Sequence, residues 1–405
     1  MQPFRQFHRF YRLMGAGLIL LLSMGLLSCH EKKPLPPSES QVTQINYQNQ
    51  LVDFSEPNLA LLADKLRHSH SQTLHIVQLG DSHTAADFFT GKLRDLFQQR
   101  YGDAGPGFVS PMTVPGQRNA RVKFSGDKTG WWLSSSRKED RADFPLGGFI
   151  ATPEHAGSTI TINLSPPDNH KYRMRVLYQS HDETYLQPQS SPLWRLPATQ
   201  SEWRFSPDNP VFFPLKLSAH DAQLKMGGWL INRQNSGVML SALGINGATI
   251  NMLNKWQPEW INTLAQLKPD LVILAYGTNE AFNDGLDLDG YRQELTAKIQ
   301  KIRSVIPDAV ILLIGPNDSL KNKHAIGCEE QQPALLRDVI RIQEEVASKQ
   351  HTLFWNWQAF MGGTCSIRNW EQQGLARPDY IHLSAAGYER SAEGLYKQFI
   401  DLIGE

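Results

Sequence analysis

Five short apolar segments, each followed by a stretch with helical periodicity or by a tight turn, constrain the fold of this chain more than any other feature. These segments cover residues 74–79, 238–243, 271–276, 310–314 and 352–357. Strands that are apolar along their whole length are buried on both faces of a sheet, and strands that alternate with helices form parallel sheets. The sequence therefore predicts an α/β fold whose doubly wound, parallel, five-stranded sheet is the middle of three layers.

The stretches with helical periodicity lie between the apolar segments and after the last one. Apolar side chains recur there every three or four residues, as at Leu295, Ile299 and Ile302. This spacing predicts helices over residues 84–101, 256–267, 291–306, 335–346 and 388–402.

The segment between the first two predicted strands has a different character. Helical stripes are absent from residues 106–236. Short β-like runs separated by Gly, Pro, Asn and Asp occur there instead, for example at 159–164, 172–178 and 211–217. A segment of about 130 residues is far too long for a loop. We therefore expect an all-β domain at 113–235, inserted into an α/β domain made of 46–112 and 236–405.

The N-terminus has the pattern of an export signal. Basic Arg5, Arg9 and Arg12 precede an apolar stretch at 13–27, which is short for a membrane-spanning helix of about 20 residues. The stretch ends in Leu-Leu-Ser-Cys, which resembles a bacterial lipobox. We expect residues 1–28 to be a lipoprotein signal peptide, and an uncleaved membrane anchor is the alternative.

By the same resemblance, Cys29 would carry the lipid, and the Pro-rich residues 29–45 would form a flexible tether. His30 stands where an aspartate commonly retains lipoproteins in the inner membrane. The resemblance thus implies export to the periplasmic face of the outer membrane, or more generally to the cell envelope.

The charge balance bears on whether the chain binds nucleic acid, and the cysteine content bears on whether it contains a disulfide. The chain has 40 basic and 40 acidic residues, so its balance gives no indication of nucleic-acid binding. Apart from Cys29, only Cys328 and Cys365 are present. In an oxidising compartment these two could form a disulfide, and two free thiols are the alternative.

Candidate catalytic residues follow the apolar segments. Ser82, in Gly-Asp-Ser-His after the first segment, lies at a strand-to-helix turn, and His83 beside it could line a pocket or simply begin the helix. His382 can act as a general base, and Asp379, three residues earlier, can orient its ring. Taken alone, each motif could equally be a helix cap or a surface turn.

Two further motifs could stabilise a developing oxyanion. Asn279, after the third segment, offers a side-chain amide, and Gly247 allows a backbone N–H to approach a substrate closely. Together with the N–H of Ser82 they would form a three-donor oxyanion hole. Gly244 is the alternative to Gly247.

These four motifs, in this order, resemble the SGNH (GDSL) hydrolases, which are named for Ser, Gly, Asn and His. The resemblance covers residues 74–105 and 237–403, and departs from the usual pattern in Gly-Asp-Ser-His and Gly-Thr-Asn-Glu. It implies a serine esterase with a Ser82–His382–Asp379 triad that needs no metal or other cofactor. Among the 13 histidines no metal-ligand spacing is present.

The sequence most resembles the peptidoglycan O-acetylesterases within this superfamily. Gly-Asp-Ser-His, the segments 101–108 and 361–363, and an inserted β-jelly-roll-like domain, possibly glycan-binding, carry this resemblance. It implies that the enzyme removes the 6-O-acetyl group of N-acetylmuramic acid in peptidoglycan glycan strands. The alternatives are an acetylxylan esterase, lysophospholipase or thioesterase on the same scaffold, or a non-catalytic wall-binding lipoprotein.

Tryptophans are concentrated in the inserted segment and could stack on sugar rings. The alternative for each of them is a place in the core of the β-domain. They are Trp131, Trp132, Trp194, Trp203 and Trp229.

Overall fold

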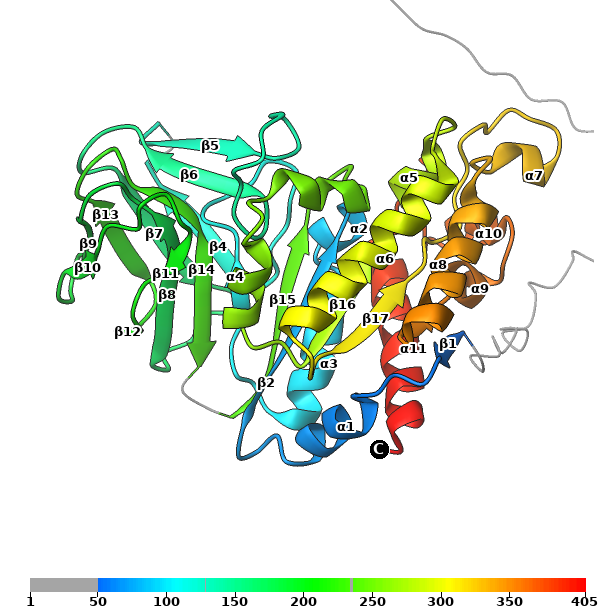
Figure 1. Cartoon of the computed structure of the whole chain (residues 1–405), viewed down its shortest axis with the longest axis horizontal. Coiled ribbons are helices and arrows are strands. Elements are labelled where there is room, and N and C mark those ends of the chain that lie inside the picture. Colours follow the sequence, from blue (N-terminus) through cyan, green and yellow to red (C-terminus); the bar gives the residue numbers. More distant parts are fainter. Residues whose placement is uncertain (1–49, 128, 234–235) are drawn as a thin grey trace, which may run out of the picture. The chain divides into compact units, whose positions relative to one another are not determined.

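A computed structural model describes residues 50–127, 129–233 and 236–405 (Figure 1). The expected signal peptide, Cys29 and the tether lie outside the described residues. Among the described residues, no helix is both long and apolar enough to cross a membrane.

The main sheet contains the five predicted parallel strands. In chain order these are β2 (Thr73–Gly80), β15 (Gly237–Gly244), β16 (Leu271–Ala275), β17 (Val310–Ile314) and β18 (Leu353–Trp355). Their spatial order is β15-β2-β16-β17-β18, so the sheet reverses its winding direction between β2 and β16. A sixth strand that the sequence did not predict, β1 (Leu51–Asp53), pairs antiparallel with β18 at one edge.

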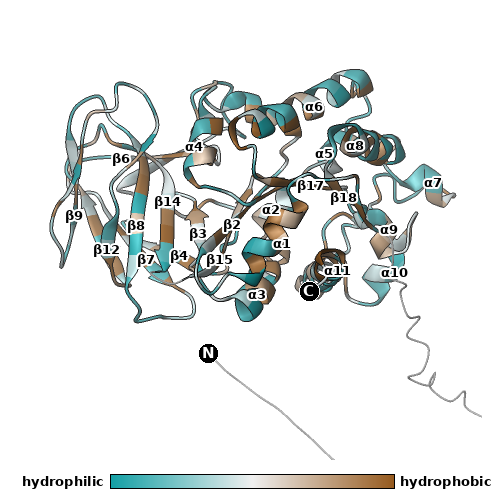
Figure 2. Cartoon of the chain, turned by 60° about the horizontal axis from the view of Figure 1, so that its bottom comes forward, coloured by the Kyte–Doolittle hydropathy of each residue, from teal (hydrophilic) through white to brown (hydrophobic). Residues whose placement is uncertain are grey.

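Helices cover both faces of this sheet, and their apolar sides turn toward it (Figure 2). One face packs against α4 (Trp260–Gln266), α6 (Leu288–Val305) and α8 (Leu336–Gln350). The other packs against α1 (Leu59–Arg67), α3 (Phe89–Tyr101) and α11 (Ala385–Ile403). Successive strand residues alternate between the two cores, since Val77 and Leu79 belong to the first and Leu74 and Ile76 to the second. This confirms the three-layer α/β arrangement.

Two antiparallel sheets occupy the segment between β2 and β15 in the chain. The first has the order β10-β9-β13-β7-β4, and the second the order β11-β8-β14-β6-β5, with β12 on β8 and β3 on β14. Apolar side chains between them, including Trp229, Tyr172 and Leu217, form a separate core. The strands are β3 (Gly107–Val109), β4 (Val122–Gly126), β5 (Trp131–Ser135), β6 (Phe149–Pro153), β7 (Thr159–Leu164), β8 (Tyr172–Gln179), β9 (Thr184–Pro188), β10 (Trp194–Leu196), β11 (Arg204–Phe205), β12 (Asn209–Val211), β13 (Leu215–Ala219) and β14 (Lys225–Arg233).

The structure corrects two predicted strands and two predicted helices. The strand expected over 352–357 ends at Trp355, because Asn356 caps a short helix that begins at the next residue. The run 211–217 is not one strand, because β12 ends at Val211 and β13 begins in the other sheet after Pro214, which lacks an N–H. The helix expected over 84–101 is interrupted at Asp87, whose φ of 43° is not helical. The helix expected over 256–267 begins only at Trp260, because Pro258 disfavours helical geometry at the preceding residue.

Short helices lie in the loops of the α/β part. They are α2 (Ser82–Ala85), the 3₁₀ helix η1 (Ile250–Lys255), α5 (Thr278–Phe282), α7 (Cys328–Gln331), α9 (Trp357–Met361) and α10 (Ser366–Gln372).

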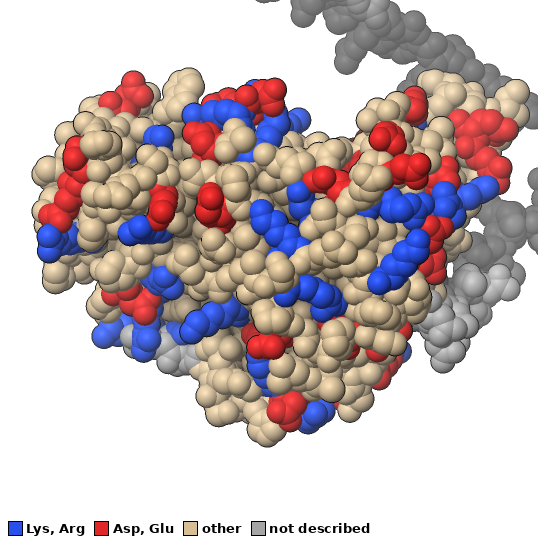
Figure 3. Space-filling view, viewed as in Figure 1, with Lys and Arg blue, Asp and Glu red and all other residues tan. Residues whose placement is uncertain are grey.

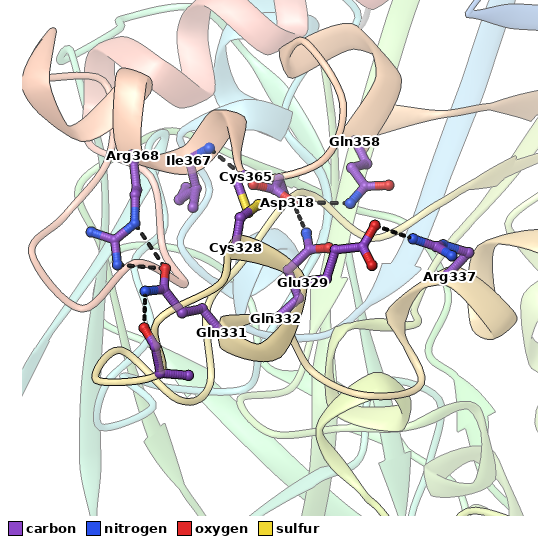
Figure 4. Close-up of a disulfide and its surroundings, with 11 residues drawn as sticks. Asp318, Cys328, Glu329, Gln331, Gln332, Arg337, Gln358, Cys365, Ile367 and Arg368 are labelled. Atoms are coloured by element: carbon purple, nitrogen blue, oxygen red, sulfur yellow. Dashed lines mark hydrogen bonds and ion pairs between the residues drawn. A yellow bond between two sulfur atoms is a disulfide. The ribbon is translucent and has the colours of Figure 1, made fainter.

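A disulfide joins Cys328 of α7 to Cys365 before α10, with a Cα–Cα distance of 6.1 Å (Figure 4). Beside it, the buried carboxylate of Asp318 accepts hydrogen bonds from the Ile367 N–H and the Gln358 side-chain amide, both at 2.9 Å. The disulfide and Asp318 therefore tie the loop after β17 to the α9–α10 region.

Candidate active site

The candidate site lies where ligands are expected in a doubly wound sheet, at the carboxyl ends of the strands beside the winding reversal. Ser82 follows β2 after one residue, and Asn279 lies in α5 after β16, the neighbouring strand. Asp81 caps α2, since its Oδ1 accepts a hydrogen bond of 2.9 Å from the His83 N–H. The cap fixes the turn that carries the Ser82 hydroxyl.

Ser82, His382 and Asp379 come together although 300 residues separate the first two. Ser82 Oγ is 3.0 Å from His382 Nε2, and His382 Nδ1 is 2.9 Å from Asp379 Oδ2. A carboxylate can only accept, so the proton on the His382 ring lies at Nδ1, and Nε2 is free to accept the serine proton. This is the geometry that activates a serine hydroxyl as a nucleophile.

Asp379 is held in its ionised form by its surroundings. Partial burial raises the pKa of the Asp379 carboxyl, but hydrogen bonds from the N–H groups of His382 and Ile381 and from the His382 ring outweigh it. The pKa therefore lies below its ordinary value of 3.8. Both backbone bonds are 2.9 Å long and reach Oδ1, which leaves Oδ2 for the ring.

The groups expected to form an oxyanion hole gather beside Ser82. Gly247, with φ of +77°, lines the same hollow as Ser82 and Asn279. The Asn279 amide donates one N–H to the Ala248 carbonyl at 2.9 Å, which orients the group and leaves its second N–H free for a ligand. Gly244 is placed differently, because a Cβ on it would lie 2.1 Å from the Ala85 nitrogen. The Gly244 position serves close packing of β15 on α2.

A buried carboxylate joins the two segments that carry these groups. Glu280 Oε1 accepts a bond of 2.7 Å from the Ile250 N–H, and Oε2 accepts one of 3.0 Å from the Gly277 N–H. Burial raises the pKa of Glu280 to about 7, against the hydrogen bonds that lower it. Burial likewise raises the pKa of Asp81 to about 7, and the nearby charge of Glu280 adds to that effect.

His83 does not line the hollow. Its side chain is buried behind the triad, with its ring centroid 5.3 Å from that of His382 and its Nδ1 2.8 Å from the Tyr388 hydroxyl. Burial, followed by the nearby charge of His382, lowers the pKa of His83 to about 3, so the ring is neutral. It therefore packs against the His382 ring from within the fold.

Two family models match the chain. One is described as peptidoglycan O-acetylesterase, N-terminal, and matches residues 104–211. The other is described as the GDSL-like lipase/acylhydrolase family and matches residues 219–390. A solved structure described as a peptidoglycan O-acetylesterase in action is 36% identical, with a TM-score of 0.81, over 88% of this chain and 99% of that one. The chain belongs to the peptidoglycan O-acetylesterase family.

More distant structures add nothing to this assignment of family. A lipase/acylhydrolase from Enterococcus faecalis is 19% identical with a TM-score of 0.33, over 41% of this chain and 78% of that one. The acetyl xylan esterase AlAXEase is 20% identical with a TM-score of 0.33, over 40% and 81%. Among curated proteins, none matches the chain significantly.

In this esterase, the sequence did not predict three arginines that lie around Ser82. A hollow of about 590 Å³ opens at Ser82, and Arg118, Arg137 and Arg377 lie on its wall. They come from loops without a repeating pattern, so no sequence signal placed them there. The described lining is Ser82, Ala86, Phe88, Gly116, Gln117, Arg118, Arg137, Asn246, Gly247, Asn279, Arg377, His382 and Tyr388.

The inserted tryptophans divide into buried and exposed groups. Trp131, Trp194, Trp203 and Trp229 are at most 7% exposed, so they fill cores. Trp132 on β5 is 65% exposed and is the member of this set that a sugar ring could reach.

Proposed function

We propose that this protein is a peptidoglycan O-acetylesterase that hydrolyses the 6-O-acetyl ester of N-acetylmuramic acid, with Ser82 as nucleophile. The observation that carries the proposal is the chain of contacts from Ser82 through His382 to Asp379, in a chain that belongs to this family. Membership of the family supports peptidoglycan as the substrate, and the contacts among Ser82, His382 and Asp379 support a serine-nucleophile mechanism.

The reaction proceeds in two acyl transfers. His382 Nε2 takes the Ser82 proton as Oγ attacks the acetyl carbonyl. The bond between the acetyl carbon and the C6 oxygen of the sugar then breaks, and the same proton goes to that oxygen, which leaves as a hydroxyl group. Water then attacks the acetyl-Ser82 ester, again with His382 as base, and releases acetate. The N–H groups of Ser82 and Gly247 and the Asn279 amide stabilise the negative oxygen formed in each step.

The test uses the Ser82→Ala variant on O-acetylated peptidoglycan. We expect acetate release to fall to background, and mass spectrometry of muropeptides to show that the acetyl groups remain. The matched control is Ser71→Ala, an exposed position after α1, which should act like the wild type. Acetate release by a correctly folded Ser82→Ala variant would refute the assignment of the nucleophile.

We also propose the domain division and anchoring that the sequence suggests. A jelly-roll-like, possibly glycan-binding insert at 113–235 would hold the wall polymer, and a lipid on Cys29 would keep the enzyme at the periplasmic face of the outer membrane. The two antiparallel sheets support the insert. Loss of membrane association in a Cys29→Ala variant expressed in its host tests the anchor, and unchanged fractionation would contradict it.

A further inference from the structure

The wall of the Ser82 hollow has a charge that neither the acetyl group nor a neutral sugar requires. Arg118, Arg137 and Arg377 line it, and none of the described lining residues is Asp or Glu. On the face drawn in Figure 3, by contrast, basic and acidic side chains are both scattered over the surface. The hollow therefore combines an esterase nucleophile with unbalanced positive charge.

Arg137 lies beside Gly247, one of the expected oxyanion donors. It lies in the turn after β5, and its side chain is exposed. A Cβ on Gly247 would lie 3.8 Å from Arg137 Nε, so the guanidinium borders the space where the acetyl oxygen would lie. The acidic residues of the same turn are occupied elsewhere, since Glu139 pairs with Arg141 at 3.2 Å and Asp140 with Lys255 at 3.3 Å.

Arg118 is fixed on another side of the hollow by contacts that do not neutralise it. Its guanidinium lies 4.2 Å from the centre of the Phe88 ring and donates to the Asp87 carbonyl. The Asp87 carboxylate is itself paired with buried Arg94 at 3.2 Å. Arg118 therefore keeps its net charge and has further N–H groups for a ligand.

Arg377 lies on the loop that leads to Asp379 and His382. Its backbone N–H donates to the His382 carbonyl at 2.8 Å, which fixes the start of its side chain beside the triad. In the described part of the chain, no carboxylate forms an ion pair with Arg137 or Arg377, whereas most other arginines in the structure have such a partner. Two exposed, unpaired guanidinium groups beside a nucleophile are available to bind an anion.

We propose that Arg118, Arg137 and Arg377 bind carboxylates of the substrate and so select acetylated glycans that carry anionic substituents. This rests on the proposed function, because muramic acid, unlike the sugars of xylan or chitin, carries a lactyl ether. The lactyl group ends in a carboxylate or in a peptide that has its own carboxylates. Arginine binds carboxylates through paired, charge-assisted hydrogen bonds, which give selectivity as well as affinity.

The test compares four 6-O-acetylated substrates by kcat/KM. They are a muropeptide with free peptide carboxylates, the same muropeptide with those groups converted to amides, a peptide-free disaccharide with a free lactyl carboxylate, and neutral chitooligosaccharides. We expect the wild-type kcat/KM to be about tenfold or more higher for the muropeptide with free carboxylates than for its amide. A factor of this size corresponds to one hydrogen bond to a charged group. The disaccharide separates recognition of the lactyl group from recognition of the peptide.

The preference should depend on the arginines and on salt. In the Arg137→Gln/Arg377→Gln variant the ratio of kcat/KM for carboxylate over amide should fall by about tenfold, and it should also fall as salt screens the charges. Arg118→Gln is tested separately, because the contacts of Arg118 with Phe88 and Asp87 also hold the segment between α2 and α3; this variant should lower the same ratio. Arg337→Gln, an exposed arginine on α8 that does not line the hollow, makes the same charge change and should leave the ratio as in the wild type.

A binding measurement distinguishes failure of this inference from failure of the proposed function. In the Ser82→Ala background, the muropeptide with free carboxylates should bind more tightly than its amide, and Arg137→Gln/Arg377→Gln should remove the difference. Equal affinities for the two ligands would overturn the arginine proposal even if the wild type releases acetate. The proposed function would instead be overturned if the Ser82→Ala protein binds the carboxylate ligand selectively but the wild type hydrolyses none of the muramyl substrates.

Discussion

The two carboxylate oxygens of Asp379 accept hydrogen bonds from different groups, so a substitution at this position can test the role of the residue in the triad. Oδ1 accepts two backbone N–H groups, while Oδ2 accepts from the His382 ring. An asparagine at 379 can keep the backbone bonds with its oxygen, but its NH₂ group then faces Nδ1 as a donor. The His382 ring would be forced into the tautomer with its proton on Nε2, which cannot take the serine proton.

We therefore expect Asp379→Asn to fold normally and to lose activity. kcat should fall by about 100- to 10,000-fold, the upper value being the loss recorded for the equivalent change in a serine protease triad. The measurement is kcat on 4-nitrophenyl acetate, together with the melting temperature. A loss below about threefold with an unchanged melting temperature would show that Asp379 does not set the tautomer.

At the scale of single residues, the sequence predicted which motif residues come together around Ser82 better than it predicted the residues that surround them. Ser82 and Asn279 occur in short motifs directly after apolar strands, and strand ends must meet at one edge of a parallel sheet. His382 occurs in a short motif just before the last amphipathic helix. Arg137 and Tyr388 have no such marker. Arg137 belongs to a turn of the β-rich segment, and Tyr388 lies within the apolar stripe of the last helix, so only the tertiary structure brings them to the site.

The elements were predictable wherever burial dictated the pattern. β16 and β17 are buried at every position, which gives an unbroken apolar run in the sequence. β1 has only three residues at the sheet edge, two half-buried and one exposed, so it leaves no pattern to recognise. The boundaries at Asp87 and Pro214 depend on backbone geometry at one residue, which periodicity does not report.

Glu280 connects two elements, and we expect its replacement to disturb both. Glu280→Gln keeps one acceptor oxygen, so either the Ile250 or the Gly277 N–H loses its partner. A buried donor left unpaired costs about 1–3 kcal/mol of stability. If the Gly247 or Asn279 segment shifts, kcat should fall by up to about 100-fold, the typical loss for one oxyanion donor.

The measurements for Glu280→Gln are urea unfolding and kcat on an acetyl ester, with the exposed Glu259→Gln of the α4 cap as control. The stability of the control should stay close to that of the wild type. Wild-type kcat in a Glu280→Gln protein of reduced stability would mean that Glu280 supports the fold without positioning the oxyanion donors.

The disulfide lies on elements outside the triad, and its removal should lower stability more than activity. Cys328 and Cys365 are 37 residues apart, and closing such a loop contributes about 4 kcal/mol in the chain-entropy model. Asp318 still ties the same loop to α10 when the bond is absent, so the native arrangement should persist. A Cys328→Ser/Cys365→Ser variant should unfold at lower urea concentration with kcat within about threefold of the wild type. Two free thiols in the oxidised, denatured wild type would contradict the pairing.

At the scale of the whole molecule, the β-rich segment between β2 and β15 shares a hydrophobic core with the α/β part. Its Phe108, Trp203 and Leu230 pack in the same core as Leu243 and Trp260 of the α/β part. Its loops also bring Arg118 and Arg137 to the hollow. We expect replacement of residues 113–235 by a short linker to expose this core and give an insoluble protein without esterase activity. A soluble, active deletion variant would show that the two parts are separable.

The pH dependence of stability tests whether burial controls the charge of four side chains in the fold. Two of these groups should raise the free energy of unfolding as pH rises, and the other two should lower it. Burial lowers the pKa of His75 to about 4 and that of His83 to about 3, so their contribution to stability is lost as pH falls from about 6.5. Burial raises the pKa of Asp81 and Glu280 to about 7. The folded protein then holds protons that the unfolded chain has released, so these two groups lower stability as pH rises from about 4 to 7.

The unfolding curve of the wild type alone cannot separate these effects, but a difference between two proteins can. Asp81→Asn keeps an oxygen for the His83 N–H and removes the titration of Asp81. Its free energy of unfolding, minus that of the wild type, should rise between pH 4 and 7 and level off above that. The measurement is urea unfolding at one-unit pH intervals. A difference that stays constant across this range would mean that Asp81 is ionised in the folded protein at pH 4, and that burial does not control its charge.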